Sequence, residues 1–115
     1  MAVVFVTNRA GDHDYTPAEK WGALRFVTSG NYPIFKTTRL REEIIEALIH
    51  STPDDYLCIS GSAVVASLCT IVWLELHKQV NMLLYDRQNE VYVLRTIERS
   101  NLRMEIERAV DSLQP

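Results

Sequence analysis

Short apolar runs rich in β-branched and aromatic residues recur along this chain, and segments with helical character separate most of them. The first run, residues 2–7, is apolar almost throughout, which is typical of a strand buried on both faces of a sheet. Similar runs predict strands at residues 24–28, 56–59, 80–85 and 90–96. Because only the polar residues 86–89 separate the last two, these strands are expected to form an antiparallel hairpin.

The intervening segments predict four helices of different character. Thr16 as N-cap and Pro17 at the first helical position begin a short helix of about two turns. The next helix has Leu40, Ile44 and Leu48 at four-residue spacing, and Ile45 and Ile49 are expected to widen this apolar stripe. Residues 63–74 are apolar on nearly all sides and predict a helix covered by other parts of the protein. The last helix spans residues 98–113 and has one apolar side, formed by Leu102, Ile106, Val110 and Leu113.

The order of these elements predicts an α/β fold. We expect a three-layer sandwich with a mostly parallel five-stranded sheet and an antiparallel edge hairpin, formed by residues 1–115 as a single domain. The first crossover, residues 9–23, leaves little room for a full helix.

Composition narrows the classes of function. With 115 residues of which 47% are hydrophobic, the chain can build one core. A formal charge of −3 and the lack of a basic stripe argue against binding to nucleic acid. The longest nearly uncharged apolar run, residues 63–74, is too short to span a membrane, which takes about 20 residues. Cys58 and Cys69 lie inside apolar runs and are predicted to be buried thiols, so we expect a cytoplasmic protein.

Polar segments follow each of the first four predicted strands, at residues 8–15, 29–31, 60–62 and 86–87. In open α/β sheets, ligands bind outside the carboxyl ends of the strands. The sequence therefore predicts a binding site where these segments meet. The candidate contacts are Asn8, His13, Asp14, Tyr15, Ser29, Gly30, Asn31, Ser60, Gly61 and Ser62.

Two of these segments suggest the chemistry of the ligand. Gly61 lies between two serines at a strand-to-helix turn, where backbone N–H groups can meet an anion. Tyr15 is expected to stack on a base or ribose. Together they indicate an anionic, nucleotide-like small molecule. The alternative for Ser60 or Ser62 is a helix cap, and the two roles are compatible.

The segment Asp12-His13-Asp14 offers carboxylates beside an imidazole, which can act in acid–base catalysis, ligate a metal or form an ordinary Asx turn. Adjacent residues do not share one face, and no second His lies nearby in the sequence. A triad of Ser60, His13 and an Asp has no support from spacing. We expect no metal and no cofactor at this site.

The last predicted helix mixes both signs of charge on its polar side, which is typical of a solvated or subunit-facing helix. Its apolar side is expected to complete the core or to form a dimer contact. Because a small α/β domain with so apolar a central helix gains burial by pairing with itself, we expect a homo-oligomer.

Several segments between residues 3 and 96 resemble a group of small uncharacterised α/β proteins of phages and bacteria. They are Val-Val-Phe-Val-x-Asn at 3–8, His-Asp-Tyr at 13–15, Phe-Val-Thr-Ser-Gly-Asn at 26–31, Asp-Asp-Tyr-Leu at 54–57, Ser-Gly at 60–61 and Val-Asn-Met-Leu-Leu-Tyr-Asp at 80–86. Ser29 stands where the resemblance would place a Glu. The resemblance implies a phage protein and, by analogy, a counter-defence role such as sequestering a nucleotide immune signal.

Three functions follow from these observations. The leading hypothesis is a non-enzymatic binding protein for an anionic nucleotide-like molecule, such as a cyclic ADP-ribose isomer. The alternative is a small hydrolase or nucleotide-cleaving enzyme that uses His13 or Asp14. The third is an interaction protein that docks a host factor through its last helix or its hairpin.

Overall fold

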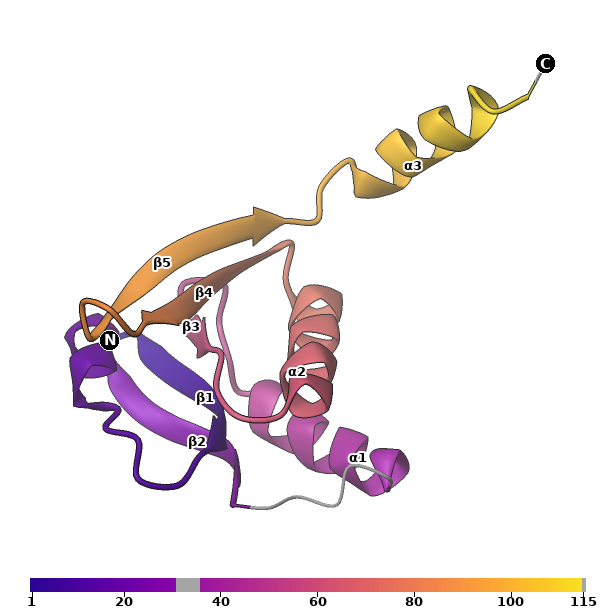
Figure 1. Cartoon of the computed structure of the whole chain (residues 1–115). Coiled ribbons are helices and arrows are strands. Elements are labelled where there is room, and N and C mark those ends of the chain that lie inside the picture. Colours follow the sequence, from indigo (N-terminus) through magenta and orange to yellow (C-terminus); the bar gives the residue numbers. More distant parts are fainter. Residues whose placement is uncertain (31–35, 115) are drawn as a thin grey trace.

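The computed structural model of the chain describes residues 1–30 and 36–114 (Figure 1). Its centre is a five-stranded sheet in the order β2-β1-β3-β4-β5. The strands are β1 (Val3–Arg9), β2 (Ala23–Ser29), β3 (Tyr56–Cys58), β4 (Gln79–Asp86) and β5 (Val91–Glu98). Neighbouring strands pair in parallel except β4 and β5, which are antiparallel. The predicted α/β fold with a mostly parallel sheet and an antiparallel edge hairpin is confirmed.

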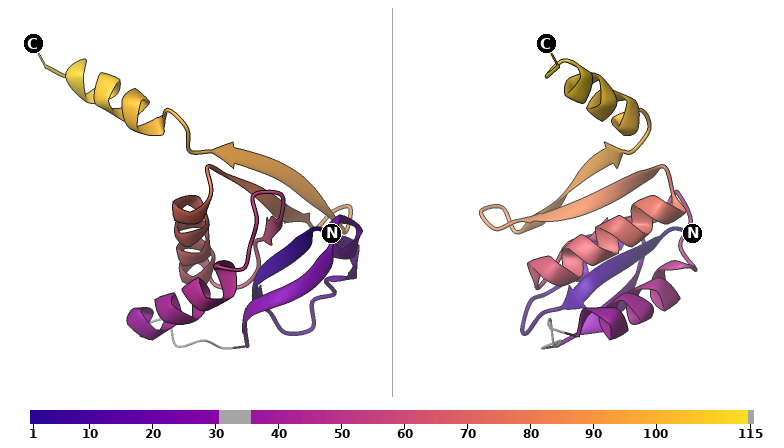
Figure 2. Two further views of the ribbon diagram at one scale, coloured as in Figure 1. Left: turned by 180° about the vertical axis from the view of Figure 1, so that it is seen from behind. Right: turned by 90° about the vertical axis from the view of Figure 1, so that its right-hand side faces the viewer.

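The helices lie on both faces of this sheet (Figures 1 and 2). The 3-10 helix η1 (Thr16–Trp21) connects β1 to β2, α1 (Thr37–Leu48) connects β2 to β3, and α2 (Ala63–Leu76) connects β3 to β4. The first connection runs along the sheet in the opposite direction to the other two. Because parallel crossovers are right-handed, a reversal of direction moves the connection to the other face. Thus α1 and α2 share one face, and η1 covers the other.

Each face of the sheet has its own apolar cluster. Phe5, Leu57 and Val80 face α1 and α2, where they meet residues such as Leu40 and Trp73. Their strand neighbours point the other way and meet Tyr15 and Ala18; these neighbours are Val4, Val6, Cys58 and Leu83. A strand buried on both faces must be apolar at consecutive positions, which explains the uninterrupted run at the start of the chain.

The third layer is thin, because the first crossover has room only for the six residues of η1. The predicted cap of this helix is wrong. The N-cap position is Tyr15, and the Thr16 N–H donates to Asp14 Oδ1 at 2.9 Å. Asp14 therefore stabilises the turn that begins the helix.

The buried apolar stripe of α1 is narrower than predicted. Leu40, Ile44 and Leu48 are fully buried, whereas Ile45 and Ile49 are 42% and 55% exposed. A helix at the margin of a sheet buries one stripe spaced by four residues, and positions beside this stripe remain in solvent.

The apolar helix α2 buries Val65, Ala66, Cys69 and Trp73. Its other side is open, since Ile71 is 60% exposed, so the prediction that other parts of the protein cover it on nearly all sides is wrong for a single chain. Cys58 and Cys69 are buried as predicted, and burial raises the pKa of these thiols to about 11 and about 12, respectively.

The last helix, α3 (Leu102–Asp111), extends away from the rest of the molecule (Figures 1 and 2). None of its residues is buried. The expectation that its apolar side completes the core is therefore wrong. Among the described residues, no helix is both long enough and apolar enough to cross a membrane.

Candidate functional site

The strand order reverses between β1 and β3, because the chain leaves β1 toward β2 and leaves β3 toward β4. In open α/β sheets, such a reversal separates the two loops that follow the strands and opens a crevice at their carboxyl ends. Here these loops are residues 10–15 and 59–62. Three sets of contacts hold these loops and the end of β1 together.

The Tyr15 hydroxyl is the first point of contact. It accepts a hydrogen bond from the Ala10 N–H at 2.7 Å and lies 3.2 Å from the Asn8 carbonyl oxygen, to which it can donate. It also lies 2.7 Å from Ser60 Oγ. One buried oxygen therefore joins the loop after β1 to the loop after β3.

Asn8 is the second point of contact, and its side chain is bonded at both ends. Its Nδ2 donates to the Gly30 carbonyl at 3.2 Å, and its Oδ1 accepts from the Thr28 hydroxyl at 3.0 Å. Gly61 packs directly against it with a φ of 80°, and a Cβ at this position would lie 2.6 Å from Asn8 Nδ2. Only glycine meets both the conformation and the space at this position.

Thr7 is the third point of contact and holds the backbone of Ser60. Its hydroxyl donates to the Ser60 carbonyl at 2.6 Å and accepts from the Ser60 N–H at 2.9 Å. Two residues later, Ser62 Oγ accepts from the Val64 N–H at 3.2 Å, so the predicted capping role of Ser62 at α2 is confirmed. The turn from β3 into α2 is thus fixed on both sides.

An aromatic cluster forms one wall of the site. The His13 ring meets Tyr15 and Tyr85 edge to face, with centroids 4.6 Å away in both pairs. Its Nε2 lies 2.7 Å from the Tyr92 hydroxyl. Burial and the neighbouring Cys58 raise the pKa of Tyr92 above its ordinary value, so its hydroxyl stays protonated near neutral pH.

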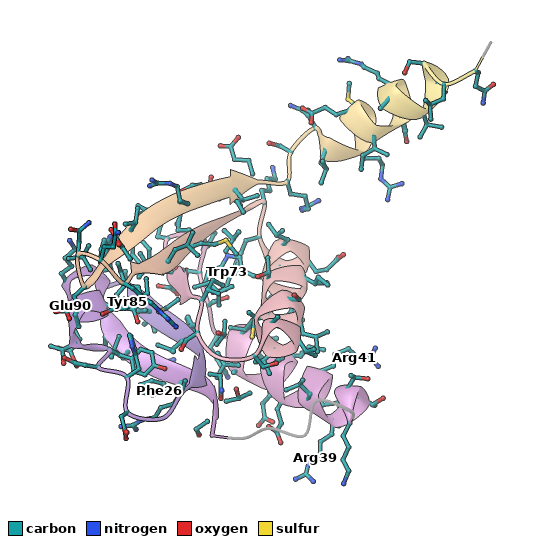
Figure 3. The ribbon with its side chains drawn as sticks, in the orientation of Figure 1. Phe26, Arg39, Arg41, Trp73, Tyr85 and Glu90 are labelled. Carbon is teal, nitrogen blue, oxygen red and sulfur yellow. The ribbon has the colours of Figure 1, made fainter. Side chains whose placement is uncertain are left out.

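These contacts surround a hollow of about 560 Å³ at the carboxyl ends of β1, β3 and β4. Its volume is in the range of small-molecule sites, about 300–1,000 Å³. Tyr85 lies at the hairpin end of the sheet, near Glu90 of the turn and far from Arg41 of α1 (Figure 3). The lining residues are Ala10, His13, Ile59, Ser60, Gly61, Leu84, Tyr85, Arg87 and Tyr92. We refer to this space as the switch-point hollow.

The chemistry of this hollow is mixed. Tyr85 is half-buried and offers an aromatic surface, and Arg87 is exposed and has no carboxylate within salt-bridge distance among the described residues. The adjacent Asp86 is engaged in its own turn, where it accepts from Asn89 and Gln88, and these bonds lower its pKa. In the described part of the chain, the Gly61 N–H has no acceptor. The arrangement can therefore hold a flat ring and an anionic group side by side.

A second hollow of about 690 Å³ lies beside η1 and β2. It includes Arg9, whose guanidinium carbon is 4.9 Å from the centre of the Phe26 ring, and it also includes Glu19. This hollow is larger and shares His13 with the switch-point hollow, but its lining comes from the β1, η1 and β2 side alone and includes no residue of the loop at 59–62. We therefore regard the switch-point hollow as the candidate site.

The predicted site residues divide into three groups. His13, Ser60 and Gly61 line the switch-point hollow. Asn8 and Tyr15 are buried supports beneath it, and the expected stacking of Tyr15 on a ligand is wrong because its ring is 5% exposed and packs against His13 and Phe26.

The third group lies outside this hollow. Asp14 is exposed and bonded to Thr16, which lowers its pKa. Ser29 and Gly30 lie at the end of β2, where the Gly30 N–H donates to the Arg9 carbonyl at 3.0 Å. Ser62 caps α2. Asn31 falls outside the described residues.

Six lining residues are not among the predicted contacts. Three are small or apolar, namely Ala10, Ile59 and Leu84, and the other three are the aromatic and charged residues Tyr85, Arg87 and Tyr92. The rule that ligands bind at the carboxyl ends of strands already pointed to residues 86–87 after the fourth strand. Following the antiparallel register across the hairpin would have added Tyr92, which pairs with Tyr85.

The arrangement does not form the catalytic pairs considered from the sequence. The Nε2 atom of His13 is bonded to Tyr92, while Ser60 Oγ is bonded to Tyr15. Asp14 is bonded to Thr16. Within residues 1–30 and 36–114, no three His, Cys, Asp or Glu side chains gather as a metal site would require.

The chain is similar to a known family of phage proteins. The model of a family described as Phage Pam3 gp32-like protein matches residues 3–99. No curated protein and no solved structure matches the chain.

Proposed function

This chain belongs to the phage Pam3 gp32-like protein family, and from that premise we propose that it is a non-enzymatic binding protein for an anionic, nucleotide-like small molecule. The predicted resemblance to small phage proteins is confirmed. The ligand would occupy the switch-point hollow, with its ring against Tyr85 and its anionic group near Gly61 and Arg87. In a phage protein, such binding would sequester a nucleotide immune signal of the host, for example a cyclic ADP-ribose isomer, in the host cytoplasm.

The observation that carries this proposal is the position of the hollow. It lies where the strand order reverses, between loops that six polar contacts among Thr7, Asn8, Ala10, Tyr15, Thr28 and Ser60 hold in place. A rigid site costs less conformational entropy on binding than a mobile one. The supporting residues thus favour a pre-formed binding site.

The lining of the hollow supports a nucleotide-like ligand over a longer nucleic acid. The hollow offers one aromatic side, together with one cation and one N–H group that have no partner among the described residues, which suits a single base and one or two phosphates. A continuous strand would need a row of cations, whereas this protein carries a net charge of −3.

Binding without turnover is supported by the hydrogen bonds of His13. Because its Nε2 lies 2.7 Å from the Tyr92 hydroxyl, this nitrogen is occupied by a group that stays neutral. A general base needs to reach the proton that it removes. We therefore assign His13 a positioning role against Tyr85 and Tyr92.

The test is thermal melting of the full chain with a panel of cyclic nucleotides and cyclic ADP-ribose isomers, with inorganic phosphate as a reference. At least one nucleotide should raise the melting temperature, and Arg87→Gln should weaken its binding about tenfold or more, since a hydrogen bond to a charged group contributes about 1.5–3 kcal/mol. The matched control is Arg41→Gln, because Arg41 is an exposed arginine on α1 far from Tyr85 (Figure 3). No shift with any nucleotide would refute the proposal.

Mass spectrometry of the bound sample separates binding from catalysis. The ligand should be recovered intact after the protein is denatured. Recovery of a cleaved product that His13→Ala no longer forms would identify the alternative, a nucleotide-cleaving enzyme.

A further inference from the structure

Helix α3 has an apolar side that nothing in the described chain covers. Leu102, Ile106 and Val110 recur every four residues and are 49%, 53% and 50% exposed. Isolated helices shorter than about 12–15 residues are only marginally stable in water. A ten-residue helix with this apolar side therefore requires a packing partner.

The main body has an uncovered apolar surface of its own, on the face that carries α2. Ile71 on the outer side of α2 is 60% exposed, and Leu84 and Ile97 on the hairpin are 39% and 47% exposed. Leu84 and Ile97 belong to the same face as Val80 and Met82, because side chains alternate along β4 and Val80 pairs with Ile97. Helix α2 covers the β3 and β4 part of this face and leaves β5 without a helix (Figure 2).

An apolar hollow of about 380 Å³ lies between α2 and the β3–β4 part of the sheet. It is lined by Ile59, Ala66, Ser67, Thr70, Ile71 and Met82. A further hollow of about 660 Å³ separates Glu75 near the end of α2 from Leu102 and Ile106 of α3. We refer to the uncovered surface formed by Ile71, Leu84 and Ile97 as the open α2–hairpin face. The apolar side of α3 and this face are thus neighbouring surfaces, and neither has a partner in the described part of the chain.

The chain exposes more surface than a compact monomer of its mass is expected to expose. The molecule exposes 7878 Å², whereas a compact monomer of 13.2 kDa is expected to expose about 6,400 Å². The radius of gyration is 15.7 Å, against about 13 Å for a compact chain of this length. The excess of roughly 1,500 Å² exceeds the surface of about 800 Å² that each partner of a stable complex typically buries.

We propose that α3 is a dimerisation arm, and that α3 of a second copy of this chain packs on the open α2–hairpin face, beside the outer side of α2. The exchange is reciprocal, so each copy gives its arm and receives the other. A reciprocal exchange closes as a two-fold dimer and leaves no unpaired surface for further growth. It supplies β5 with the helix layer that α2 gives to its neighbouring strands.

The connection before α3 supports exchange between copies. The Arg99 N–H donates to the Lys78 carbonyl at 2.8 Å, which ties the end of β5 to the start of β4. Asn101 then has a left-handed conformation with a φ of 71°, and α3 begins one residue later. This turn directs the helix away from its own sheet (Figure 1).

The test is the mass of the full chain in solution, measured by light scattering after gel filtration. The wild type should elute as a dimer of twice 13.2 kDa. Ile106→Glu and, separately, Ile71→Glu should each give a monomer, because each puts a carboxylate into the proposed interface. Both residues are more than half exposed in the single chain, so neither substitution should disturb its fold, which circular dichroism checks.

The matched control is Met104→Glu, which introduces the same carboxylate on the same helix. Met104 is 51% exposed and lies about 160° around the helix from Ile106, so this variant should remain a dimer. A monomeric wild type, in which α3 is free or packs on its own chain, would overturn the proposal. A dimer that persists in Ile106→Glu or in Ile71→Glu would overturn it as well.

Discussion

At the scale of single residues, the candidate site depends on side chains that support the switch-point hollow without lining it. The Tyr15 hydroxyl joins the Ala10 N–H, the Asn8 carbonyl and Ser60 Oγ through distances of 2.7, 3.2 and 2.7 Å. It thereby fixes the two loops that border the switch-point hollow. A buried polar group without its partner costs about 1–3 kcal/mol.

We predict that Tyr15→Phe lowers the free energy of unfolding by about 1–3 kcal/mol, because the Ala10 N–H loses its acceptor. Urea denaturation measures this change. Tyr85→Phe is the control, since within the described residues the Tyr85 hydroxyl has no hydrogen bond, and it should change stability by less than about 0.5 kcal/mol. Equal effects of the two substitutions would contradict the role given to Tyr15.

Gly61 gives a second prediction at this scale. Alanine at Gly61 adds the strain of a positive φ to a clash with Asn8 at 2.6 Å, and we expect a loss of about 2–4 kcal/mol. Gly11 has a φ of 41° and space around it among the described residues, so Gly11→Ala should cost only about 1–2 kcal/mol. Urea denaturation gives the loss in free energy of unfolding for each variant, and the difference between the two losses measures the clash. Equal losses would show that Asn8 does not press against residue 61.

The sequence identified these residues but not their separate tasks. Asn8, Tyr15 and Gly61 were all expected to contact ligand, yet two of them are supports. The partners of Asn8 and Tyr15 are Gly30, Thr28 and Ser60, which are 20 to 45 positions away, so local patterns do not reveal which polar atoms are already bonded. Tyr85 was missed for a similar reason, because an aromatic residue in a predicted strand looks like ordinary core.

At the scale of elements, local periodicity predicted the strands and helices well. The run at residues 2–7 became β1 (Val3–Arg9), and the four-residue spacing of Leu40, Ile44 and Leu48 gave the buried stripe of α1. The extent of burial could not be predicted in the same way. Ile45 and Ile71 are exposed. Whether a helical side chain is buried depends on neighbours that are distant in the sequence, and a local pattern does not show these neighbours.

The end of α2 gives a prediction about pH. Burial lowers the pKa of His77 below its ordinary value of 6.5, with a smaller opposing effect of Asp55. The unfolded chain therefore binds more protons at His77 than the folded chain does near and below pH 6.5. The free energy of unfolding should be highest above pH 6.5 and should fall as the pH is lowered through this value.

Urea denaturation between pH 7.5 and pH 5 measures this slope. His77→Gln should reduce it, because glutamine does not titrate, while His50→Gln at an exposed position should leave it in place. A slope that is the same in His77→Gln and in the wild type would contradict the effect assigned to His77.

At the scale of the whole molecule, the sheet order determines where a ligand can bind. The reversal between β1 and β3 places η1 alone on one face and leaves the loops after both strands free to enclose a hollow. The sequence predicted that these loops meet at one edge, since carboxyl ends of parallel strands share an edge. The sequence did not decide whether α3 lies inside or outside the core, because an apolar helix side has the same pattern whether it packs on its own chain or on another.

The central claim is that the switch-point hollow binds an anionic nucleotide-like molecule, and amide NMR spectra recorded during titration with the nucleotide panel test it most directly. We predict that at least one nucleotide shifts the amide signals of Ala10, Gly61 and Arg87 most strongly, with little change in the signals of α1. Spectra that stay unchanged with every nucleotide, or shifts confined to residues away from this hollow, would contradict the claim.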